Sequence, residues 1–212
     1  MERGDIRADG RFTATRPPSR GRGRPPSRKT EQAILDATAG LLAERGLSEI
    51  SLEDIAARGR VSKASIYRRW PSKGTLAFDA FVAEFLGHQP TPDTGRLEDD
   101  LLIALRSWVR TVDGTAAGRT LKGLIAEVQR DPELAEAWRE RFIGPVRESH
   151  LIMAERAIAR GELPPEADTN LLLDLLYGPA YHRLLQGHLP LDEDFVDAVV
   201  RVISAAVKAA AI

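Results

Sequence analysis

Apolar residues recur every three or four positions along most of this 212-residue chain, and no useful stretch alternates apolar with polar positions. The first spacing is that of amphipathic helices and the second that of half-buried strands, so the sequence predicts an all-α protein. We expect helices over residues 30–45, 52–59, 63–69, 72–87, 97–112, 116–130, 132–160, 168–187 and 192–210. A bend is expected at Gly144-Pro145 and a weak point at Gly178-Pro179, because proline cannot donate a helical hydrogen bond.

Polar residues at the ends of the second and third predicted helices indicate two short helices joined by a tight turn. Ser51 and Asp54 have the spacing of a capping box, in which each side chain accepts a hydrogen bond from a free backbone N–H group. Gly59 is expected to end the first of these helices in the left-handed conformation, and Ser62 is a good N-cap for the second.

The second of these short helices has few apolar positions. Only Ile66 and Trp70 are clear core anchors, and the other face is polar and basic. An ordinary solvated helical hairpin would not need a second helix so short and so poor in apolar residues. The pattern therefore favours a helix-turn-helix whose second helix lies in a DNA groove.

Residues 51–73 resemble the DNA-binding motif of the TetR family of one-component repressors. The matching elements are Ile55-Ala56-Ala57, Val61-Ser62-Lys63, Ile66-Tyr67-Arg68 and Trp70-Pro71-Ser72-Lys73. The resemblance is good over residues 30–85 and looser beyond, where the run Leu175-Leu176-Tyr177-Gly178-Pro179 is similar to one C-terminal subgroup. Arg60 departs from the family pattern, which places Gly directly before the Val of the turn. Either Arg60 is left-handed or the turn is shifted by one residue.

The resemblance implies an N-terminal three-helix helix-turn-helix domain followed by a C-terminal helical ligand-binding and dimerisation domain. We place the first domain at residues 30–88 and the second at 96–212, with a proline-containing loop between them. The charge distribution agrees: residues 1–73 carry 16 Lys and Arg against 9 Asp and Glu, whereas residues 74–212 carry 14 against 22. A basic unit joined to an acidic one is typical of a protein that has a DNA-binding domain and a separate ligand-sensing domain.

Residues 1–29 are rich in Gly, Pro, Ser and Arg, and we expect a disordered basic arm. Within it, residues 20–26 resemble the core of an AT-hook, in which Arg22 and Arg24 would enter a narrow A·T minor groove. A merely solubilising or nonspecific tail explains the same composition equally well.

The position of each residue in the motif predicts its role on double-stranded DNA. Lys63, Ala64 and Tyr67 are expected to face the bases, with Arg68 as a further candidate. Ser65, Arg69 and Lys73 are expected to anchor phosphates, helped by the helix N-termini at the capping residues. The full set expected to bind DNA is Ser51, Ser62, Lys63, Ala64, Ser65, Tyr67, Arg68, Arg69 and Lys73, with Arg22 and Arg24 of the arm.

The last two predicted helices are richer in aliphatic residues than one buried face requires. Packing within a monomer core is one explanation. The family resemblance implies the other, a homodimer formed through a four-helix bundle, which we favour. Two copies on a two-fold axis would double the DNA contacts and match a palindromic operator.

The resemblance also implies a pocket for a small effector within the C-terminal helices. Aromatic and aliphatic side chains are the candidates for its lining, although each is also an ordinary core residue: Leu105, Trp108, Val109, Leu124, Val128, Trp138, Phe142, Met153, Tyr177 and Tyr181. Their character favours an apolar or aromatic effector.

Other functional classes have little support in the sequence. The four histidines lack metal-ligand spacing, Cys is absent, and no phosphate-binding loop or nucleophile elbow is found, so we expect no enzyme, metal site or cofactor. No apolar run approaches a membrane span and the N-terminus does not resemble a secretory signal, so we expect a cytoplasmic protein without a membrane partner. The main alternative to a ligand-released repressor is a nonspecific architectural protein that prefers A·T-rich DNA.

Overall fold

The computed structural model describes residues 28–85 and 91–209, and these contain helices and turns but no strand. The helices are α1 (Arg28–Arg45), α2 (Leu52–Gly59), α3 (Lys63–Tyr67), α4 (Lys73–Phe85), α5 (Leu97–Val112), α6 (Ala116–Val128), α7 (Pro132–Trp138), α8 (Gly144–Ala159), α9 (Thr169–Gln186) and α10 (Glu193–Lys208). A short 3₁₀ turn, η1 (Leu47–Glu49), follows α1, and a π-helical turn, η3 (Arg139–Ile143), joins α7 to α8. The predicted all-α fold is therefore confirmed.

Side-chain caps explain why most helix ends lie close to the predicted positions. The carboxylate of Asp168 accepts a hydrogen bond from the Leu171 N–H group at the start of α9, and Gly187 ends that helix in the left-handed conformation. Four ends differ from the prediction by two residues. α1 begins at Arg28, so the last two residues of the predicted arm are helical. α3 ends at Tyr67 instead of residue 69, α6 at Val128 instead of 130, and α10 at Lys208 instead of 210.

The predicted helix over residues 132–160 is interrupted by the π turn. The irregularity lies at η3, immediately before the expected bend at Gly144-Pro145. Pro145 has no N–H group to donate to the preceding turn, and a widened turn accommodates this loss of a helical hydrogen bond. In α9 the helix continues through Pro179.

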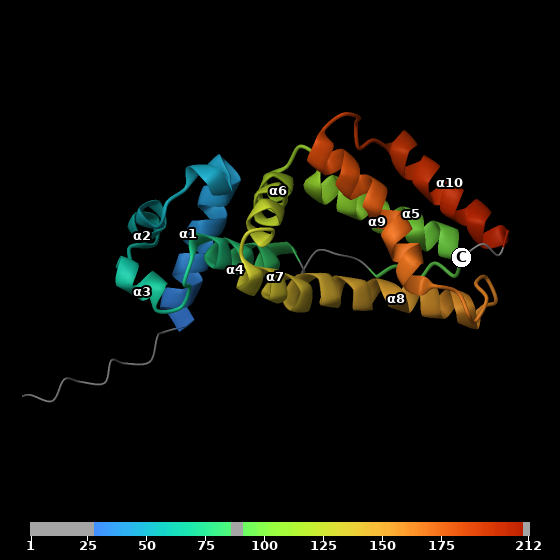
Figure 1. Cartoon of the computed structure of the whole chain (residues 1–212), viewed down its shortest axis with the longest axis horizontal. Helices are drawn as coiled ribbons and strands as arrows, with labels where there is room; N and C mark the ends of the chain where they lie inside the picture. The colour runs from blue at the N-terminus through green and yellow to red at the C-terminus, as the bar shows by residue number, and fades with distance from the viewer. Residues whose placement is uncertain (1–27, 86–90, 210–212) are drawn as a thin grey trace, which may run out of the picture.

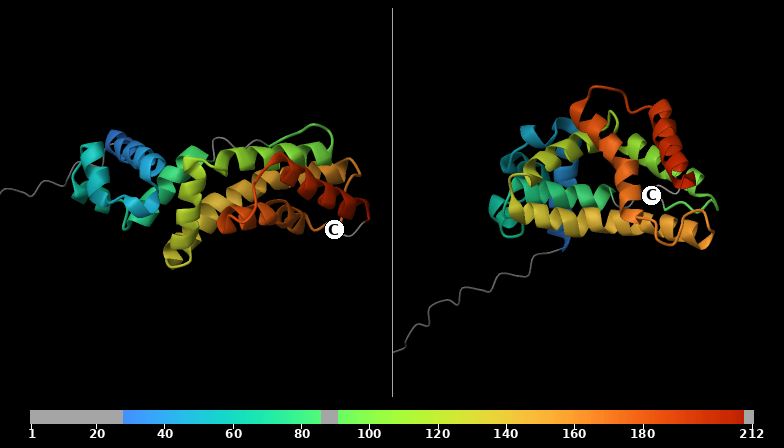
Figure 2. Two further views of the ribbon diagram at one scale, coloured as in Figure 1. Left: turned by 90° about the horizontal axis from the view of Figure 1, so that it is seen from above. Right: turned by 45° about the vertical axis from the view of Figure 1, so that its right-hand side comes forward.

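The molecule is elongated, with α1–α3, here called the N-terminal unit, at one end and α5–α10, the C-terminal body, at the other (Figure 1). α4 packs against α1 on one side and against α6 and α7 on the other. α4 therefore joins the two parts of the molecule. α9 and α10 contact each other and lie at the end of the molecule remote from α2 and α3 (Figure 2).

One apolar core runs through both parts. It extends from Ile34 in α1 through the aromatic residues of α4 to Ile203 in α10. Rings from α4 and η3 meet at its centre, where the centroids of Phe81 and Phe142 are 5.4 Å apart. In the part of the chain that the structure describes, no helix is long and apolar enough to cross a membrane.

Candidate nucleic-acid interface and C-terminal cavity

The capping box predicted at α2 is present. The Asp54 N–H group donates to the Ser51 hydroxyl oxygen at 3.1 Å, and the Ser51 N–H group donates to the Asp54 carboxylate at 2.9 Å. At the start of α3 the Ser65 N–H group donates to the Ser62 hydroxyl oxygen at 3.2 Å. These bonds satisfy backbone donors that helix geometry leaves free, so both short helices are held at their first turns.

The turn between α2 and α3 is built on a left-handed arginine. Arg60 has φ 53° and ψ 44°, and it is the one non-glycine residue with positive φ among residues 28–85 and 91–209. The N–H groups of Arg60 and Val61 donate to carbonyls of Ala57 and Ala56, which is the Schellman arrangement. Of the two alternatives left open by the sequence, the structure has the first.

Gly59 does not take the left-handed conformation expected for it, and that prediction is wrong. It is the last residue of α2 and packs against α1. A Cβ atom added there would lie 3.3 Å from the carbonyl oxygen of Ala33 and 3.5 Å from the Ala37 methyl group. The glycine therefore permits close approach of two helices, while Arg60 bears the conformational strain of the turn.

Two anchors hold α3, as predicted. Ile66 is fully buried, and Trp70, just after the helix, is 4% exposed with its indole N–H group donating to Asp79 of α4 at 2.8 Å. The residues predicted to face bases all lie outside this core: Lys63, Ala64, Tyr67 and Arg68 are exposed, and Tyr67 is 56% exposed. Within α3, Ile66 therefore packs in the core, Ser65 is half-buried, and the other three residues are exposed to solvent.

The predicted base-facing lysine is engaged by a carboxylate in the protein alone. The Lys63 ammonium donates to the Glu53 carboxylate of α2 at 2.6 Å. The hydrogen bond with Lys63 lowers the pKa of Glu53, and the same bond raises the pKa of Lys63. Both groups are exposed, so DNA binding would exchange this ion pair for contacts to the nucleic acid.

Two of the three predicted phosphate anchors have structural contacts that the sequence did not indicate. The Lys73 ammonium donates to the carbonyl oxygens of Leu47 at 2.7 Å and Ile50 at 3.0 Å, which ties α4 to the turn after α1. The Arg69 side chain is only 14% exposed and pairs with Glu31 of α1 at 3.3 Å. That Lys73 and Arg69 bind phosphate remains a prediction, whereas their contacts with other residues of the fold are present in the structure. The third, Ser65, is half-buried.

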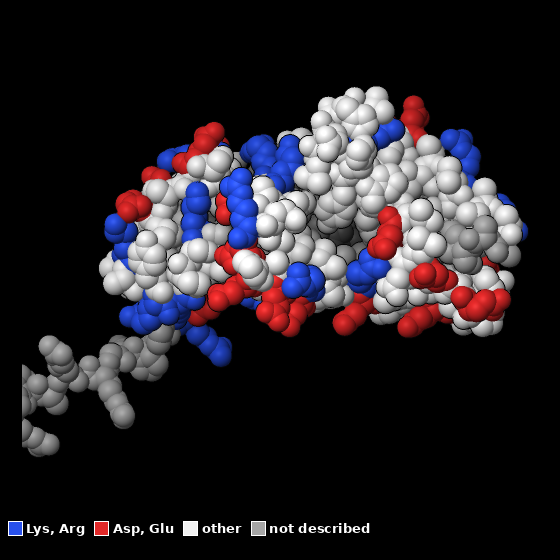
Figure 3. Space-filling model, viewed as in Figure 1, with Lys and Arg blue, Asp and Glu red and all other residues white. Residues whose placement is uncertain are grey.

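Basic side chains gather at the end of the molecule where α1 and α3 lie, whereas acidic ones are more numerous along the lower edge of the C-terminal body in this view (Figure 3). Seven of the 16 Lys and Arg residues in the first 73 positions belong to residues 1–27. That segment, which includes Arg22, Arg24 and all but the last two residues of the predicted arm, lies outside the described residues.

A cavity of about 250 Å³ lies in the C-terminal body between α5, η3, α8 and α9, and α4 closes one end of it. The face shown in Figure 3 is hollowed at this place. Four of the ten predicted pocket residues line it: Trp108, Phe142, Tyr177 and Tyr181. We call it the C-terminal cavity.

The cavity contains a hydrogen-bonded pair that sequence reasoning missed. The Nδ1 atom of His150 lies 2.7 Å from the Val146 carbonyl oxygen, which can only accept, so Nδ1 carries a proton. Burial lowers the pKa of His150, which favours the neutral ring. Nε2 is then an acceptor, and the Tyr177 hydroxyl donates to it at 3.0 Å.

This pairing leaves an acceptor facing the cavity. Burial raises the pKa of Tyr177 beyond its usual range and that of Tyr181 to about 12, so both phenols are neutral. Because the Tyr177 proton goes to His150, the phenol oxygen keeps its lone pairs for a donor on a bound molecule. At the rim, Arg147 of α8 donates to Asp174 of α9 at 2.6 Å and closes one side.

The other six predicted pocket residues do not line this cavity. Leu105, Val109, Leu124, Trp138 and Met153 are buried in the packed core, and Val128 packs against it half-buried. The lining that the prediction missed comprises Phe85, Ile143, Val146, Arg147, His150, Leu173, Asp174 and Gly178. His150 lies four residues after Val146 and therefore on the same face of α8, and this polar residue was the one sequence feature that could have indicated the cavity. Helical periodicity alone does not distinguish core residues from residues that line a cavity.

Within the described residues no group of three or more His, Cys, Asp or Glu side chains is arranged to hold a metal ion.

Two protein-family models together match about three quarters of the chain. Residues 34–80 match the family described as "Bacterial regulatory proteins, tetR family", and residues 91–203 match "Tetracyclin repressor-like, C-terminal domain". The first match contains α2 and α3, and the second contains every lining residue of the C-terminal cavity except Phe85.

Individual proteins agree with these matches. The chain is 37% identical over 164 residues to the uncharacterized HTH-type transcriptional regulator YdeS of Bacillus subtilis strain 168, covering 77% of this chain and 82% of that protein. It is 32% identical over 171 residues to the DNA-binding transcriptional repressor TetR of Mycobacteroides abscessus, covering 79% and 88%. The crystal structure of the TetR family transcription regulator SCO0332 superposes with a TM-score of 0.73 at 34% identity, covering 84% of this chain and 97% of that one.

Proposed function

Since this chain belongs to the TetR family of transcriptional regulators, we propose that it represses transcription by binding a palindromic operator as a homodimer and leaves the operator when a small hydrophobic effector binds. Its relatives are regulators and not enzymes. The observation that carries the proposal is the polar, exposed face of α3. Side-chain caps fix the first turns of α2 and α3, and the fully buried Ile66 holds α3 against the core. We expect the protein to act in the cytoplasm, where its DNA lies.

Exposure supports the proposed DNA contacts on α3. Lys63, Ala64 and Tyr67 occupy its solvent face and would meet base edges, with Arg68 beside them. Ser65 lies at the first turn, where a helix N-terminus attracts phosphate. Arg69 and Lys73 would contribute positive charge near the backbone, in addition to their contacts within the fold.

An exposed apolar seam supports the proposed dimer. Leu171, Leu175 and Leu185 of α9 are 42%, 40% and 45% exposed, and their separations of four and ten residues place them on one face of the helix, here called the seam. Val202 of the adjoining α10 is 68% exposed. Pairing of α9 and α10 with the same helices of a second copy would bury this seam in a four-helix bundle.

The dimer can be tested with matched charge substitutions. Leu171→Glu combined with Leu175→Glu should convert the protein to a monomer in light scattering, because four carboxylates would enter the two-fold interface. Ile103→Glu combined with Ile152→Glu is the control, since these residues of α5 and α8 are equally exposed but lie off the seam. Equal masses for both variants would exclude this interface.

The position of α4 supports coupling between the C-terminal cavity and the DNA-binding end. Phe85 at its C-terminus lines the cavity. Asp79 accepts the Trp70 hydrogen bond and Lys73 holds the turn after α1. An effector that displaced Phe85 would therefore move the helix that positions α3, which changes the spacing of the two recognition helices in a dimer.

The first test is selection of bound duplexes from a random DNA pool at about 150 mM salt, where nonspecific phosphate binding is weakened. A palindrome with half-sites one or more helical turns apart is the expected product. The recovered operator then serves to assay release by hydrophobic compounds, and Val146→Phe, which fills the C-terminal cavity, should keep DNA binding and lose release. Recovery of A·T-rich DNA without symmetry would contradict the proposal and favour an architectural role of the arm.

A further inference from the structure

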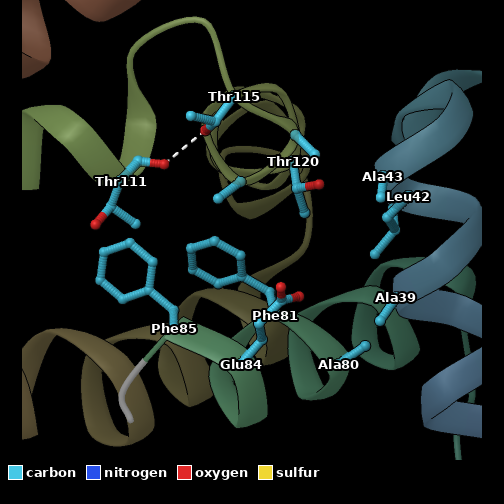
Figure 4. Close-up of a pocket in the computed structure, with 12 residues that line it drawn as sticks. Ala39, Leu42, Ala43, Ala80, Phe81, Glu84, Phe85, Thr111, Thr115 and Thr120 are labelled. Carbon is cyan, nitrogen blue, oxygen red and sulfur yellow. Dashed lines mark hydrogen bonds between the residues drawn. The ribbon is translucent and has the colours of Figure 1, made fainter. Parts of the chain in front are cut away.

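A second cavity, of about 360 Å³, lies where the N-terminal unit meets the C-terminal body (Figure 4). Residues of α1 and α4 form one side, and the end of α5 with the first turns of α6 forms the other. We call it the interdomain cavity. It is separate from the C-terminal cavity, and Phe85 is the wall that the two share.

The lining of the interdomain cavity is mostly apolar. The rings of Phe81 and Phe85 are stacked with centroids 4.9 Å apart, and both point into the space below α6 (Figure 4). Small side chains, including those of Ala39 and Ala117, leave the volume open on the other sides. The lining contains no Lys or Arg, and the one ionisable side chain in it is the acidic Glu84. These walls suit a flat apolar molecule and disfavour an anion.

Thr120 of α6 is the polar group that faces this space. The residue is 4% exposed, and its side chain has no hydrogen bond within residues 28–85 and 91–209. The other two threonines of the lining differ: Thr111 donates to the Ser107 carbonyl at 2.8 Å, and Thr115 donates to the Thr111 carbonyl at 2.5 Å. The Thr120 oxygen is not among the fully enclosed side-chain atoms that lack a partner, so it is open to the cavity, and a bound molecule with one polar atom can form a hydrogen bond with it.

We propose that the interdomain cavity is a second small-molecule site, which takes an uncharged aromatic molecule carrying a hydroxyl group. The rings of Phe81 and Phe85 would cover the apolar body of this molecule. The Thr120 hydroxyl would exchange a hydrogen bond with its polar atom, on the side of α6 that faces α1 (Figure 4). The carboxylate of Glu84 would reject the corresponding acid by charge repulsion.

The site differs from the C-terminal cavity in what its occupant would touch. Its walls come from both parts of the molecule, which are already bridged nearby by Arg119 of α6 donating to the Ala43 carbonyl of α1 at 2.8 Å. A bound molecule adds contacts between the same two helices. It therefore favours the domain arrangement in which these walls are in place, and it should raise the thermal unfolding midpoint, with a larger rise for a molecule that binds more tightly.

The amino acids that line the two cavities provide the test. Alanine methyl groups line the interdomain cavity and none lines the C-terminal one, whereas Ile143 and Val146 line only the latter. 2-Naphthol is titrated into the full chain carrying methyl-labelled Ala, Ile and Val, and methyl NMR spectra are recorded. Saturable shifts of Ala39, Ala116 and Ala117 are expected. The anionic 2-naphthoate, with the same ring system, should leave these signals in place.

Two variants separate recognition from mere filling of space. Thr120→Val keeps the shape of the side chain and should weaken 2-naphthol binding about five-fold, whereas Thr120→Ser should retain it. Tyr177→Phe removes one hydroxyl from the C-terminal cavity and should leave the alanine shifts unchanged. Shifts confined to Ile143 and Val146, equal binding of 2-naphthoate, or no effect of Thr120→Val in a variant with an unchanged unfolding midpoint would each overturn the proposal.

Discussion

The helix-turn-helix and the C-terminal cavity are built in opposite ways. In α2 and α3 the hydrogen bonds that define structure join residues two to five positions apart, as in the capping box of Ser51 and Asp54. In the cavity the defining bond joins His150 to Tyr177, 27 positions apart and on different helices. A DNA-reading surface can thus be encoded by local rules, whereas a ligand cavity depends on how distant helices cross.

Adjacent residues of α3 offer the strongest test of this contrast. Ile66→Ala should lower the free energy of unfolding by about 2–4 kcal/mol, because the side chain is fully buried. Tyr67→Ala should change it by less than about 0.5 kcal/mol, because that ring is exposed, while altering the DNA sequence preference. Urea unfolding and operator titration measure the two effects. Similar stabilities for both variants would mean that α3 is not divided into a packing face and a DNA face.

Lys73→Ala should lower both the stability of the fold and the affinity for DNA. Its ammonium donates to two carbonyl oxygens, so its loss should lower the free energy of unfolding by about 1.5–3 kcal/mol. If it also anchors a phosphate, DNA affinity should fall for all sequences and the salt dependence should become shallower. Arg68→Ala is the control, because this exposed cation should affect DNA binding alone. Wild-type affinity of Lys73→Ala over a salt series would remove Lys73 from the interface.

Arg60→Gly should stabilise the protein by about 0.5–1 kcal/mol. The left-handed conformation is strained for arginine and free of strain for glycine, although glycine also loses more entropy on folding. Gly59→Ala should do the reverse, since its Cβ would approach the Ala33 carbonyl oxygen. Thermal unfolding of both variants measures these two opposite changes in stability. A destabilised Arg60→Gly variant would show that the arginine side chain contributes more than its backbone strain removes.

Glu53→Gln should have the smallest effect, a gain in DNA affinity of roughly two- to five-fold, since it releases Lys63 and removes a negative charge near the phosphates. Glu133→Gln in α7 is the control, because it changes net charge equally at a distance from α3. Equal gains for both variants in filter binding would indicate a general charge effect with no release of Lys63.

The sequence was sufficient for the helices and for the division of α3 into buried anchors and exposed residues. Apolar spacing predicted α5 over residues 97–112 to the residue, and capping residues located α2, α3 and α9. It was insufficient for the contacts of Lys73 and Arg69, because their partners lie on the turn after α1 and on α1 itself. It was also insufficient for the cavity, where six of ten predicted residues proved to be packed core or its edge.

The amino-acid sequence by itself determined the all-α fold, the two capped helices, the buried anchors Ile66 and Trp70 and the polar face of α3 that lies away from these anchors. Those features follow from hydrogen bonds and apolar spacing within a few residues. Only the tertiary structure decided that Arg60 instead of Gly59 turns the chain, because the close approach of α1 needs the glycine. The same holds for the two cavities, since a space between helices is defined by their crossing and not by the periodicity of any one of them.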